Sequence, residues 1–260
     1  MALIRFILSI LSRVVKFPFR VVRFILGVPR SLFRRKKPEQ KNKHIGVHSV
    51  VIDDIAKIMT ELAKDRPIFH AEADFQHALA WQIKTIQPEA KIRLETRPLV
   101  TESMFLDLLV VLNGQRLGIE CKYMVKEINA SHDGEMFRLK PQSAHPIRRY
   151  DTLKDLCRLE RFIHEGAIDV GLLIVVSNDN AYWKSPSGKA TMDRDFRIHT
   201  GREVSGELQW ASNTGAGTMR DREQPLTLAD TYKLEWQPFS QPSRDIKKKF
   251  CYLAVPVGAR

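Results

Sequence analysis

Three charged side chains inside two apolar segments are the residues whose types and spacing point to chemistry. Asp107 interrupts the apolar segment 104–112, and Glu120 and Lys122 lie in the following segment 115–123. Two carboxylates and a lysine are the side chains of a site that can hydrolyse phosphodiester bonds. The acid oxygens suit Mg²⁺ or Mn²⁺, which lowers the pKa of a bound water, and the lysine holds that water and balances charge in the transition state.

The turn between these segments predicts that the three side chains meet. Asn-Gly at 113–114, between two apolar runs, is the strongest short-range signal for a β-hairpin with a two-residue type I′ turn. This register places Asp107 opposite Glu120, and directly opposed residues share a face of the sheet. Lys122 follows Glu120 by two residues, so it lies on that face as well.

A simpler interpretation of residues 119–122 (IECK) is a surface salt bridge, because Glu-x-Lys is common. Asp107 in an otherwise apolar strand favours the functional interpretation, since charged residues inside such strands are rare without a function. Two acids facing each other on buried strands repel and lose hydration, and a divalent cation that bridges both carboxylates offsets this cost.

The surrounding pattern predicts one α/β domain whose central sheet has its middle strands covered on both faces. Hydrophobic periodicity predicts helices and strands in alternation. The helices are expected at 50–65, 71–87 and 150–165, and the strands at 91–98, 104–112, 115–123 and 169–177, followed by short β segments at 194–199, 203–210, 232–237 and 250–257.

With these elements in place, the chain resembles the PD-(D/E)XK, or restriction-endonuclease-like, nuclease superfamily over roughly residues 70–177. The matching motif is Leu106-Asp107 followed by IECK at 119–122, between the helical segments HAEADFQHALAWQI and YDTLKDLCRLERFI, with the strand VGLLIVV after the second helix. Leu106 stands where the family usually has proline. The resemblance implies an α-β-β-β-α-β core with a mixed sheet flanked by helices, here with extra C-terminal strands in 181–260 and an N-terminal amphipathic helix.

The resemblance also implies roles for individual residues. Asp107 and Glu120, with the backbone carbonyl of Cys121, would bind Mg²⁺ or Mn²⁺, and Lys122 would assist the attacking water. Glu72 in the first helix would be a second-metal ligand or a partner of the metal-bound water. The implied activity is a magnesium-dependent endonuclease acting on DNA. An RNA nuclease and a non-catalytic, membrane-tethered interaction module with a nuclease-like fold remain alternatives.

The helix after the hairpin is expected to contact nucleic acid. Lys154 and Arg158 are four residues apart and share a helix face, so they are candidates for phosphate contacts together with Arg149. The alternative is a solvated helix face on which these side chains form ion pairs with neighbouring acids.

The distribution of charge separates an N-terminal arm from the rest of the chain. The net charge is +12, but ten basic residues and no acidic one lie in residues 1–37. The other 223 residues hold 32 basic and 30 acidic residues, a net charge of +2. The overall basicity is therefore not a nucleic-acid footprint of the whole protein.

Residues 1–33 have the pattern of a basic amphipathic helix, with residues 34–48 as a linker to the domain at 49–260. On a helical wheel Arg5, Arg13, Lys16, Arg20 and Arg23 fall in one polar sector about 100° wide, and the rest of the wheel is apolar. Pro18 is expected to kink or break this helix. Such an arm is predicted to lie on an anionic membrane surface. A contact with a partner protein and an organelle-targeting segment are the alternatives.

The location expected from these features is the cytoplasm, with peripheral attachment to the inner face of a membrane. No apolar run approaches the roughly 18 residues of a membrane span. The three cysteines (121, 157 and 251) are far apart and odd in number, so they indicate no disulfide framework and favour a reducing compartment.

Overall fold

The computed structural model describes residues 49–99, 104–140, 144–188, 191–242 and 249–258, all of which belong to one compact unit. The predicted arm (1–33) and linker (34–48) lie outside the described residues.

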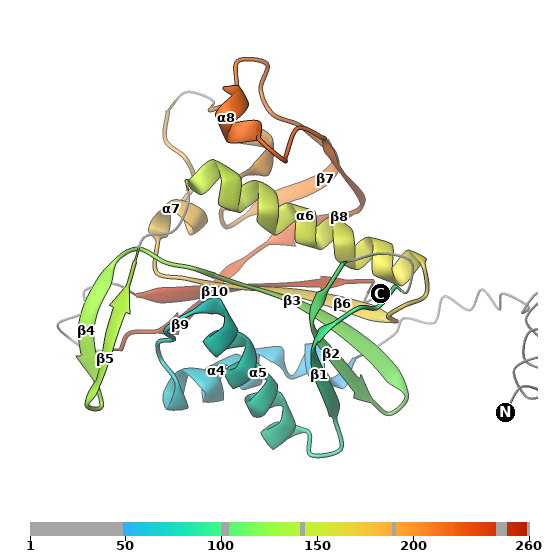
Figure 1. The fold of residues 1–260 in the computed structure, drawn as a ribbon, viewed down its shortest axis with the longest axis vertical. Helices are drawn as coiled ribbons and strands as arrows, with labels where there is room; N and C mark the ends of the chain where they lie inside the picture. Colours follow the sequence, from blue (N-terminus) through green and yellow to red (C-terminus); the bar gives the residue numbers. More distant parts are fainter. Residues whose placement is uncertain (1–48, 100–103, 141–143, 189–190, 243–248, 259–260) are drawn as a thin grey trace, which may run out of the picture. The chain divides into compact units, whose positions relative to one another are not determined.

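A mixed six-stranded sheet forms the centre of the unit (Figure 1). A mixed central sheet flanked by helices was expected, but without the two C-terminal strands that join it here. Only β3 and β6 run parallel, and the other neighbouring strands are antiparallel. The strand order is β1-β2-β3-β6-β10-β9, with β1 at Lys91–Thr96, β2 at Leu106–Leu112, β3 at Gln115–Met124, β6 at Val170–Ser177, β10 at Phe250–Val257 and β9 at Trp236–Ser240.

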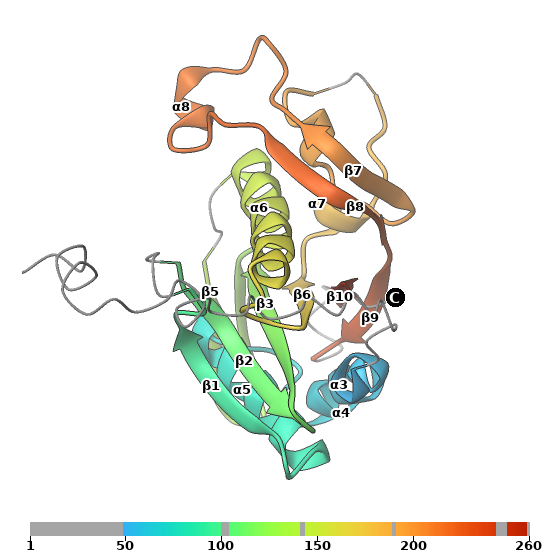
Figure 2. The same cartoon turned by 90° about the vertical axis from the view of Figure 1, so that its right-hand side faces the viewer.

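Each face of the sheet is covered by its own layer (Figures 1 and 2). On one face lie α3 (Val50–Asp53), α4 (Ile55–Asp65) and α5 (Glu72–Ile86), and on the other lie α6 (His145–His164) and a two-stranded sheet of β7 (Arg202–Leu208) and β8 (Leu226–Leu234). Strand β6 separates two apolar cores and all of its residues are buried, because its alternate side chains enter opposite cores.

The hairpin register predicted from the Asn-Gly turn is confirmed as far as Leu108 opposite Ile119, and the pairing ends before the predicted Asp107–Glu120 pair. Residues of β2 and β3 pair from Leu112 opposite Gln115 to Leu108 opposite Ile119. Asn113 and Gly114 have φ values of 52° and 80°, and a type I′ turn needs positive φ at both central residues. The local turn chemistry therefore sets the alignment of the two strands.

Several expected boundaries were wrong. The helix expected at 50–65 is divided at Asp54 into α3 and α4. The polar stretch after β3 contains a second hairpin, β4 (Ile128–His132) and β5 (Glu135–Leu139), around Asp133-Gly134, whose φ values are also positive. The remaining short helices are α7 (Asn180–Trp183) and α8 (Ala216–Met219).

The C-terminal segments differ most from the sequence prediction. The segment 194–199 is not a strand but begins with a 3₁₀ turn at Arg194–Phe196. Its buried side chains, Phe196 and Ile198, create the alternation typical of a strand, although this segment pairs with no strand in the described part of the chain. The segment 232–237 spans the end of β8 and the start of β9, and β9 and β10 complete the central sheet.

Candidate active site

The predicted catalytic residues meet at the end of β3. Ile119, Cys121 and Tyr123 of this strand point into the core beneath α4 and α5. Because side chains alternate along a strand, Glu120 and Lys122 point to the opposite face, where α6 covers β3. Glu120 is only 1% exposed, and the ammonium-bearing side chain of Lys122 is 13% exposed.

Two carboxylates complete the hydrogen bonding of β3 where its pairing with β2 ends. The Cys121 N–H donates to Asp107 Oδ2 over 2.7 Å, and the Tyr123 N–H donates to Glu72 Oε2 over 2.9 Å. A buried backbone N–H needs an acceptor, so these contacts give Asp107 and Glu72 defined positions on one edge of the strand.

Glu72 reaches β3 because it is the first residue of α5. Asp74, in the first turn of α5, fixes the start of the helix. Its Oδ2 accepts the His70 N–H over 2.9 Å, and its carboxylate forms an ion pair with Arg66. Acidic side chains are favoured in the first turn of a helix, where the backbone N–H groups are unpaired. The helix start therefore places the Glu72 carboxylate beside Lys122, with Oε1 3.8 Å from Nζ.

Helix α6 contributes two further charged groups to the site. Asp155 Oδ2 lies 2.7 Å from Lys122 Nζ, and its Oδ1 accepts from Arg158 Nη1 over 2.9 Å. Arg158 Nη2 is 2.8 Å from Glu120 Oε1. Ion pairs thus link Glu72, Lys122, Asp155, Arg158 and Glu120 in a chain of alternating charge.

The site carries more acid than base. With all groups charged, Glu72, Asp107, Glu120 and Asp155 oppose Lys122, Arg158 and Arg148, whose charge also acts on Glu72, and this leaves one negative charge. Burial raises the pKa of Glu120 to about 9, and the nearby Asp155 carboxylate contributes to this increase although Arg158 acts against it. Burial also raises the pKa values of Glu72 and Asp107. Acidic groups therefore outnumber basic ones in the site, and one divalent cation would neutralise the excess negative charge.

The donor atoms fit a hard cation such as Mg²⁺ in their chemistry. Carboxylate and carbonyl oxygens are the ligands that Mg²⁺ prefers. Glu120 Oε1 is buried and accepts no hydrogen bond from the described residues, because Arg158 is close but not aligned to donate to it. Lys122 Nζ contacts the Cys121 carbonyl over 3.3 Å.

The side chains of the candidate site are not arranged as a complete metal-binding site. Within the described ranges, no group of three or more His, Cys, Asp or Glu side chains is arranged to hold a metal ion. The side chains of Lys122 and Arg158 lie among the acids, so a cation bound by Glu120 would share that carboxylate with Arg158 or displace its guanidinium.

The three basic residues predicted to contact nucleic acid occupy different environments. Arg158 faces the site, and Lys154 is exposed. Arg149 is 3% exposed, forms an ion pair with Asp193 over 2.5 Å and donates to the Ala181 carbonyl over 2.7 Å. Arg149 therefore connects α6 to the segments that follow β6 and does not present its guanidinium on the surface.

Sequence reasoning did not assign Asp155 of α6 to the site. Thr152, Asp155 and Leu159 are all buried and are spaced three and four residues apart, so they form the inward stripe of the helix. An aspartate on this stripe, three residues before Arg158, was the available signal for a buried polar contact.

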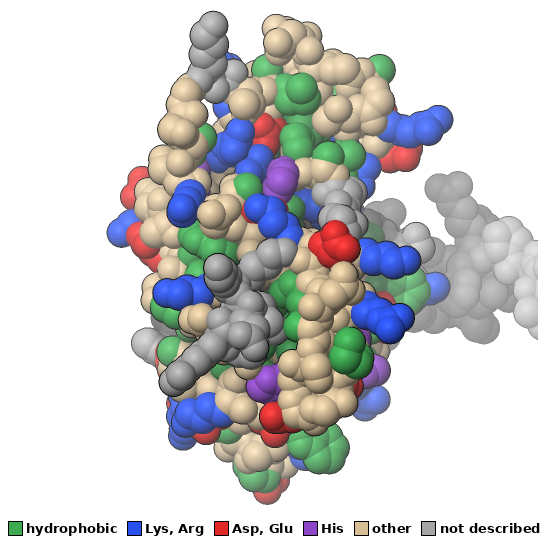
Figure 3. All heavy atoms as spheres, turned by 90° about the vertical axis from the view of Figure 1, so that its left-hand side faces the viewer, with side chains coloured by type: hydrophobic (Ala, Val, Ile, Leu, Met, Phe, Trp, Pro, Cys, Tyr) green, Lys and Arg blue, Asp and Glu red, His purple; other side chains and the backbone are tan. Residues whose placement is uncertain are grey.

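Surface charge gives no separate indication of a nucleic-acid interface near the β4–β5 hairpin. On this face, Lys and Arg side chains are interspersed with acidic ones and do not form one continuous patch (Figure 3). This distribution agrees with the nearly neutral composition of residues outside the N-terminal arm.

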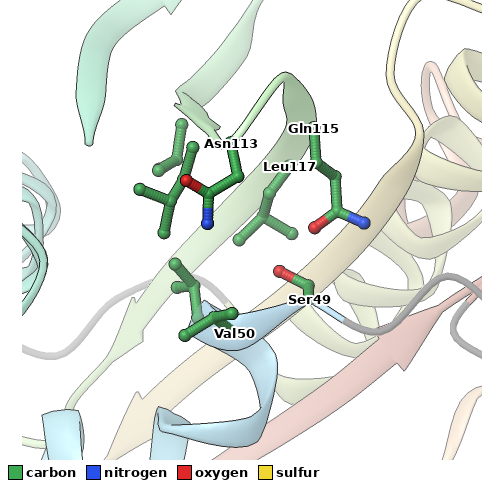
Figure 4. Close-up of a pocket in the computed structure, with 8 residues that line it drawn as sticks. Ser49, Val50, Asn113, Gln115 and Leu117 are labelled. Atoms are coloured by element: carbon green, nitrogen blue, oxygen red, sulfur yellow. The ribbon is translucent and has the colours of Figure 1, made fainter. Parts of the chain in front are cut away.

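A small cavity of about 220 Å³ lies at the opposite end of the hairpin, beside its turn. Ser49, Asn113 and Gln115 border it together with apolar residues of α3, β2 and β3 (Figure 4). None of its lining residues is charged, so this cavity lacks the groups for hydrolysis and is separate from the candidate site.

Comparison with protein-family models, curated proteins and solved structures finds no match to this chain.

Proposed function

We propose that this protein is a divalent-metal-dependent nuclease of the PD-(D/E)XK type that hydrolyses phosphodiester bonds, with DNA as its substrate. The observation that carries the proposal is the convergence of Asp107, Glu120, Lys122 and Glu72 at one end of β3, where acidic groups outnumber basic ones. Residues 72–177 follow the order helix, three strands, helix, strand, with the β4–β5 hairpin inserted before α6.

In this proposal Asp107, Glu120 and the Cys121 carbonyl hold the cation, and Glu72 supports the attacking water or a second cation. A bound Mg²⁺ would polarise the phosphate and lower the pKa of a water ligand. The backbone contact of each acid supports this assignment, because the Cys121 and Tyr123 N–H groups hold one oxygen of Asp107 and of Glu72 in place.

Lys122 acts as a cation in the proposed reaction. Burial works to lower the pKa of its ammonium group, but the Asp155 and Glu72 carboxylates together raise it above the usual value. Lys122 therefore keeps its proton, orients the attacking water and stabilises the negative charge that develops on the phosphate. Asp155 is a positioning residue, because its contact with Nζ directs the lysine side chain toward the other acids.

Cleavage by the full-length chain tests the proposal. Plasmid DNA, linear DNA and RNA are incubated with the protein and either Mg²⁺ or Mn²⁺. Wild-type protein should cut DNA, and Asp107→Ala and Lys122→Ala should each be inactive, while Lys57→Ala, at an exposed position on α4, should stay active. Cleavage of RNA alone would replace the DNA assignment with the RNA alternative. A wild type that cuts neither substrate with either metal would refute the nuclease proposal.

The second candidate is a non-catalytic interaction module with the same fold. It is favoured by the ion pairs of Lys122 and Arg158, which already neutralise part of the acidic charge. Metal-dependent thermal unfolding separates the two candidates, because a working site gains stability from Mg²⁺ or Mn²⁺ that binds only the folded state. Asp107→Ala should lose this gain. A wild type with no metal-dependent shift supports the module.

For cellular location we retain the proposal of a cytoplasmic protein held at a membrane surface by residues 1–33. In the described part of the chain, no helix is long and apolar enough to cross a bilayer. Co-sedimentation with vesicles tests the arm. Wild type should bind vesicles that contain anionic lipid, and replacing Arg13, Lys16 and Arg20 by Gln should release it. Equal sedimentation of both proteins would refute the role of the basic sector.

A further inference from the structure

The face of β2 that carries Asp107 continues beyond the candidate active site. Leu109 and Val111 lie on this face as well, because side chains alternate along a strand. Both are half-buried, whereas Leu108 and Val110, on the α5 side of the strand, are completely buried. The β1–β2 end of the sheet extends away from α6 (Figures 1 and 2). Beyond the site, this face is therefore only partly covered.

Two cations of the edge strand β1 flank the partly covered face. Arg93 pairs with Leu109, and Lys91 pairs with Val111. Directly opposed residues share a face of the sheet, so both side chains lie on the side of Asp107. Ile92, between them, packs on the opposite side into the core beneath α5. Lys91 and Arg93 are exposed, and neither forms an ion pair with any residue that the structure describes.

A third cation lies closer to the candidate site. The guanidinium carbon of Arg97 is 4.6 Å from the centre of the Phe105 ring. Phe105 comes two residues before Asp107, and its carbonyl accepts a hydrogen bond from Arg158. The same Arg158 forms an ion pair with Glu120. The stacking on Phe105 therefore holds Arg97 at the border of the site.

These three cations, Lys91, Arg93 and Arg97, are named the β1 row. One acid, Glu95, lies within the row, at a position where φ is 50°, and with it the row has a net charge of +2. Farther across the same face, Arg116 is already bound to Asp169 over 2.6 Å. A basic row therefore borders a site in which acidic groups are in excess.

The spacing of the β1 row fits a chain of phosphates. Lys91 and Arg93 are two residues apart, which is about 6.7 Å along a strand. Leu109, the partner of Arg93, is separated from Asp107 by the same interval. Positions on this face therefore lead away from the site in equal steps, and neighbouring phosphates of a nucleic-acid strand are separated by a distance of this order.

We propose that the β1 row binds the phosphates of a DNA strand on one side of the bond that is cut. Arg97 lies nearest to the cut phosphate, and Arg93 and Lys91 contact the next phosphates along the strand. The inference rests on the proposed nuclease function, because the acidic site defines where the strand is cut. It deepens that function, since the substrate must continue past the cut bond, as it does for an endonuclease.

Charged residues on an edge strand also have a simpler role. They prevent sheets of different molecules from pairing edge to edge. That role requires no contact with DNA, so the two explanations differ in whether DNA covers these side chains.

Chemical footprinting of lysines in the full-length chain tests the inference. The protein is treated with an amine-acetylating reagent, with and without a DNA duplex, and peptide mass spectrometry gives the rate at each lysine. EDTA removes divalent metal, so the DNA stays intact. DNA should slow acetylation of Lys91 several-fold. The matched control is Lys57, exposed on α4 over the other face of the sheet, whose rate should not change.

The salt dependence of DNA binding gives a second measure. For B-DNA the slope of log K against log salt changes by about 0.9 for each phosphate contact, so Lys91→Gln/Arg93→Gln should reduce it by about 1.8. Lys57→Gln/Lys64→Gln removes the same charge from α4 and should leave the slope unchanged. The N-terminal arm is present in every protein of the series, so differences between variants report the β1 row.

Equal acetylation of Lys91 with and without DNA would overturn the inference, and so would an unchanged slope in Lys91→Gln/Arg93→Gln. Protection of Lys91 by anionic vesicles and not by DNA would also overturn it and would assign the row to a membrane contact. Asp107→Ala should protect Lys91 as wild type does. A wild type that protects Lys91 but cuts no DNA would refute the nuclease proposal and leave the DNA-binding row in place.

Discussion

The strongest quantitative consequence of the site concerns Glu120 in the absence of divalent metal. Its carboxyl is almost completely buried, and burial raises its pKa to about 9 from an ordinary value of 4.5. In the unfolded chain the same carboxyl loses its proton near the ordinary value. Between these two pH values the folded protein therefore binds more protons than the unfolded chain, and its stability falls as pH rises.

The size of this effect follows from proton linkage. One proton held only by the folded state changes the free energy of unfolding by about 1.4 kcal/mol per pH unit. Between pH 5 and pH 8 the contribution of Glu120 to stability therefore falls by at most about 4 kcal/mol. The contribution is fully present below pH 4.5 and lost above pH 9.

Glu120→Gln isolates this contribution, because the amide has nearly the same shape and does not titrate. Urea unfolding of the full-length chain in EDTA gives the free energy of unfolding at pH 5 and pH 8. Wild type should lose several kcal/mol more than Glu120→Gln over this interval. Glu165→Gln, which changes an exposed glutamate after α6, should follow wild type. At pH 8, added Mg²⁺ should increase the free energy of unfolding of wild type and leave that of Glu120→Gln unchanged.

An equal pH dependence in wild type and Glu120→Gln would refute the reasoning. Burial also raises the pKa values of Glu72 and Asp107, but these groups titrate in both proteins and cancel in the comparison. If both proteins lost the same stability between pH 5 and pH 8, Arg158 would keep the Glu120 carboxylate charged throughout. The site would then need no further cation.

Three other predictions concern the frame of the site, each measured by urea unfolding. Arg149→Met should lower stability by about 3 kcal/mol, because it leaves the buried Asp193 carboxylate without its main cation, whereas exposed Lys154→Met should change it by less than about 0.5 kcal/mol. Asp155→Asn should reduce the loss of stability between pH 5 and pH 8, because the Asp155 carboxylate helps to raise the pKa of Glu120, and an unchanged pH dependence would contradict this coupling. Gly171→Ala should cost about 1–3 kcal/mol, because the new Cβ would lie 3.1 Å from the Cβ atoms of Leu159 and Val257, while Gly215→Ala, with open space around it, should be neutral.

The sequence predicted the elements that depend on local signals. The Asn-Gly turn specifies its own backbone conformation, so the pairing of β2 with β3 up to Leu108 opposite Ile119 follows from a few neighbouring residues. Beyond that pair the strands separate, and the Asp107 carboxylate accepts the Cys121 N–H. The same signal, Asp133-Gly134, was present in the polar stretch and was missed because β4 and β5 lack a strong apolar alternation.

The C-terminal segments show where local signals fail. Phe196 and Ile198 alternate as in a strand, but their side chains are buried without any strand pairing in the described residues. Strand β10 reads in the sequence as one of several short β pieces, yet it lies against β6 inside the central sheet. Such pairings join residues far apart in the chain, and the local sequence of one strand does not specify which strand it pairs with.

By itself, therefore, the sequence determined the hairpin face that carries Asp107, Glu120 and Lys122, because strand periodicity and turn type are local properties of the backbone. Only the tertiary structure decided which groups surround that face. The packing of α6 on β3 turns Asp155 and Arg158 inward, and the separation of β2 from β3 lets Asp107 and Glu72 accept the free N–H groups of the strand. The net charge of the site depends on contacts between distant segments, and periodicity and spacing do not predict those contacts. The same contacts therefore decide whether the site needs a cation.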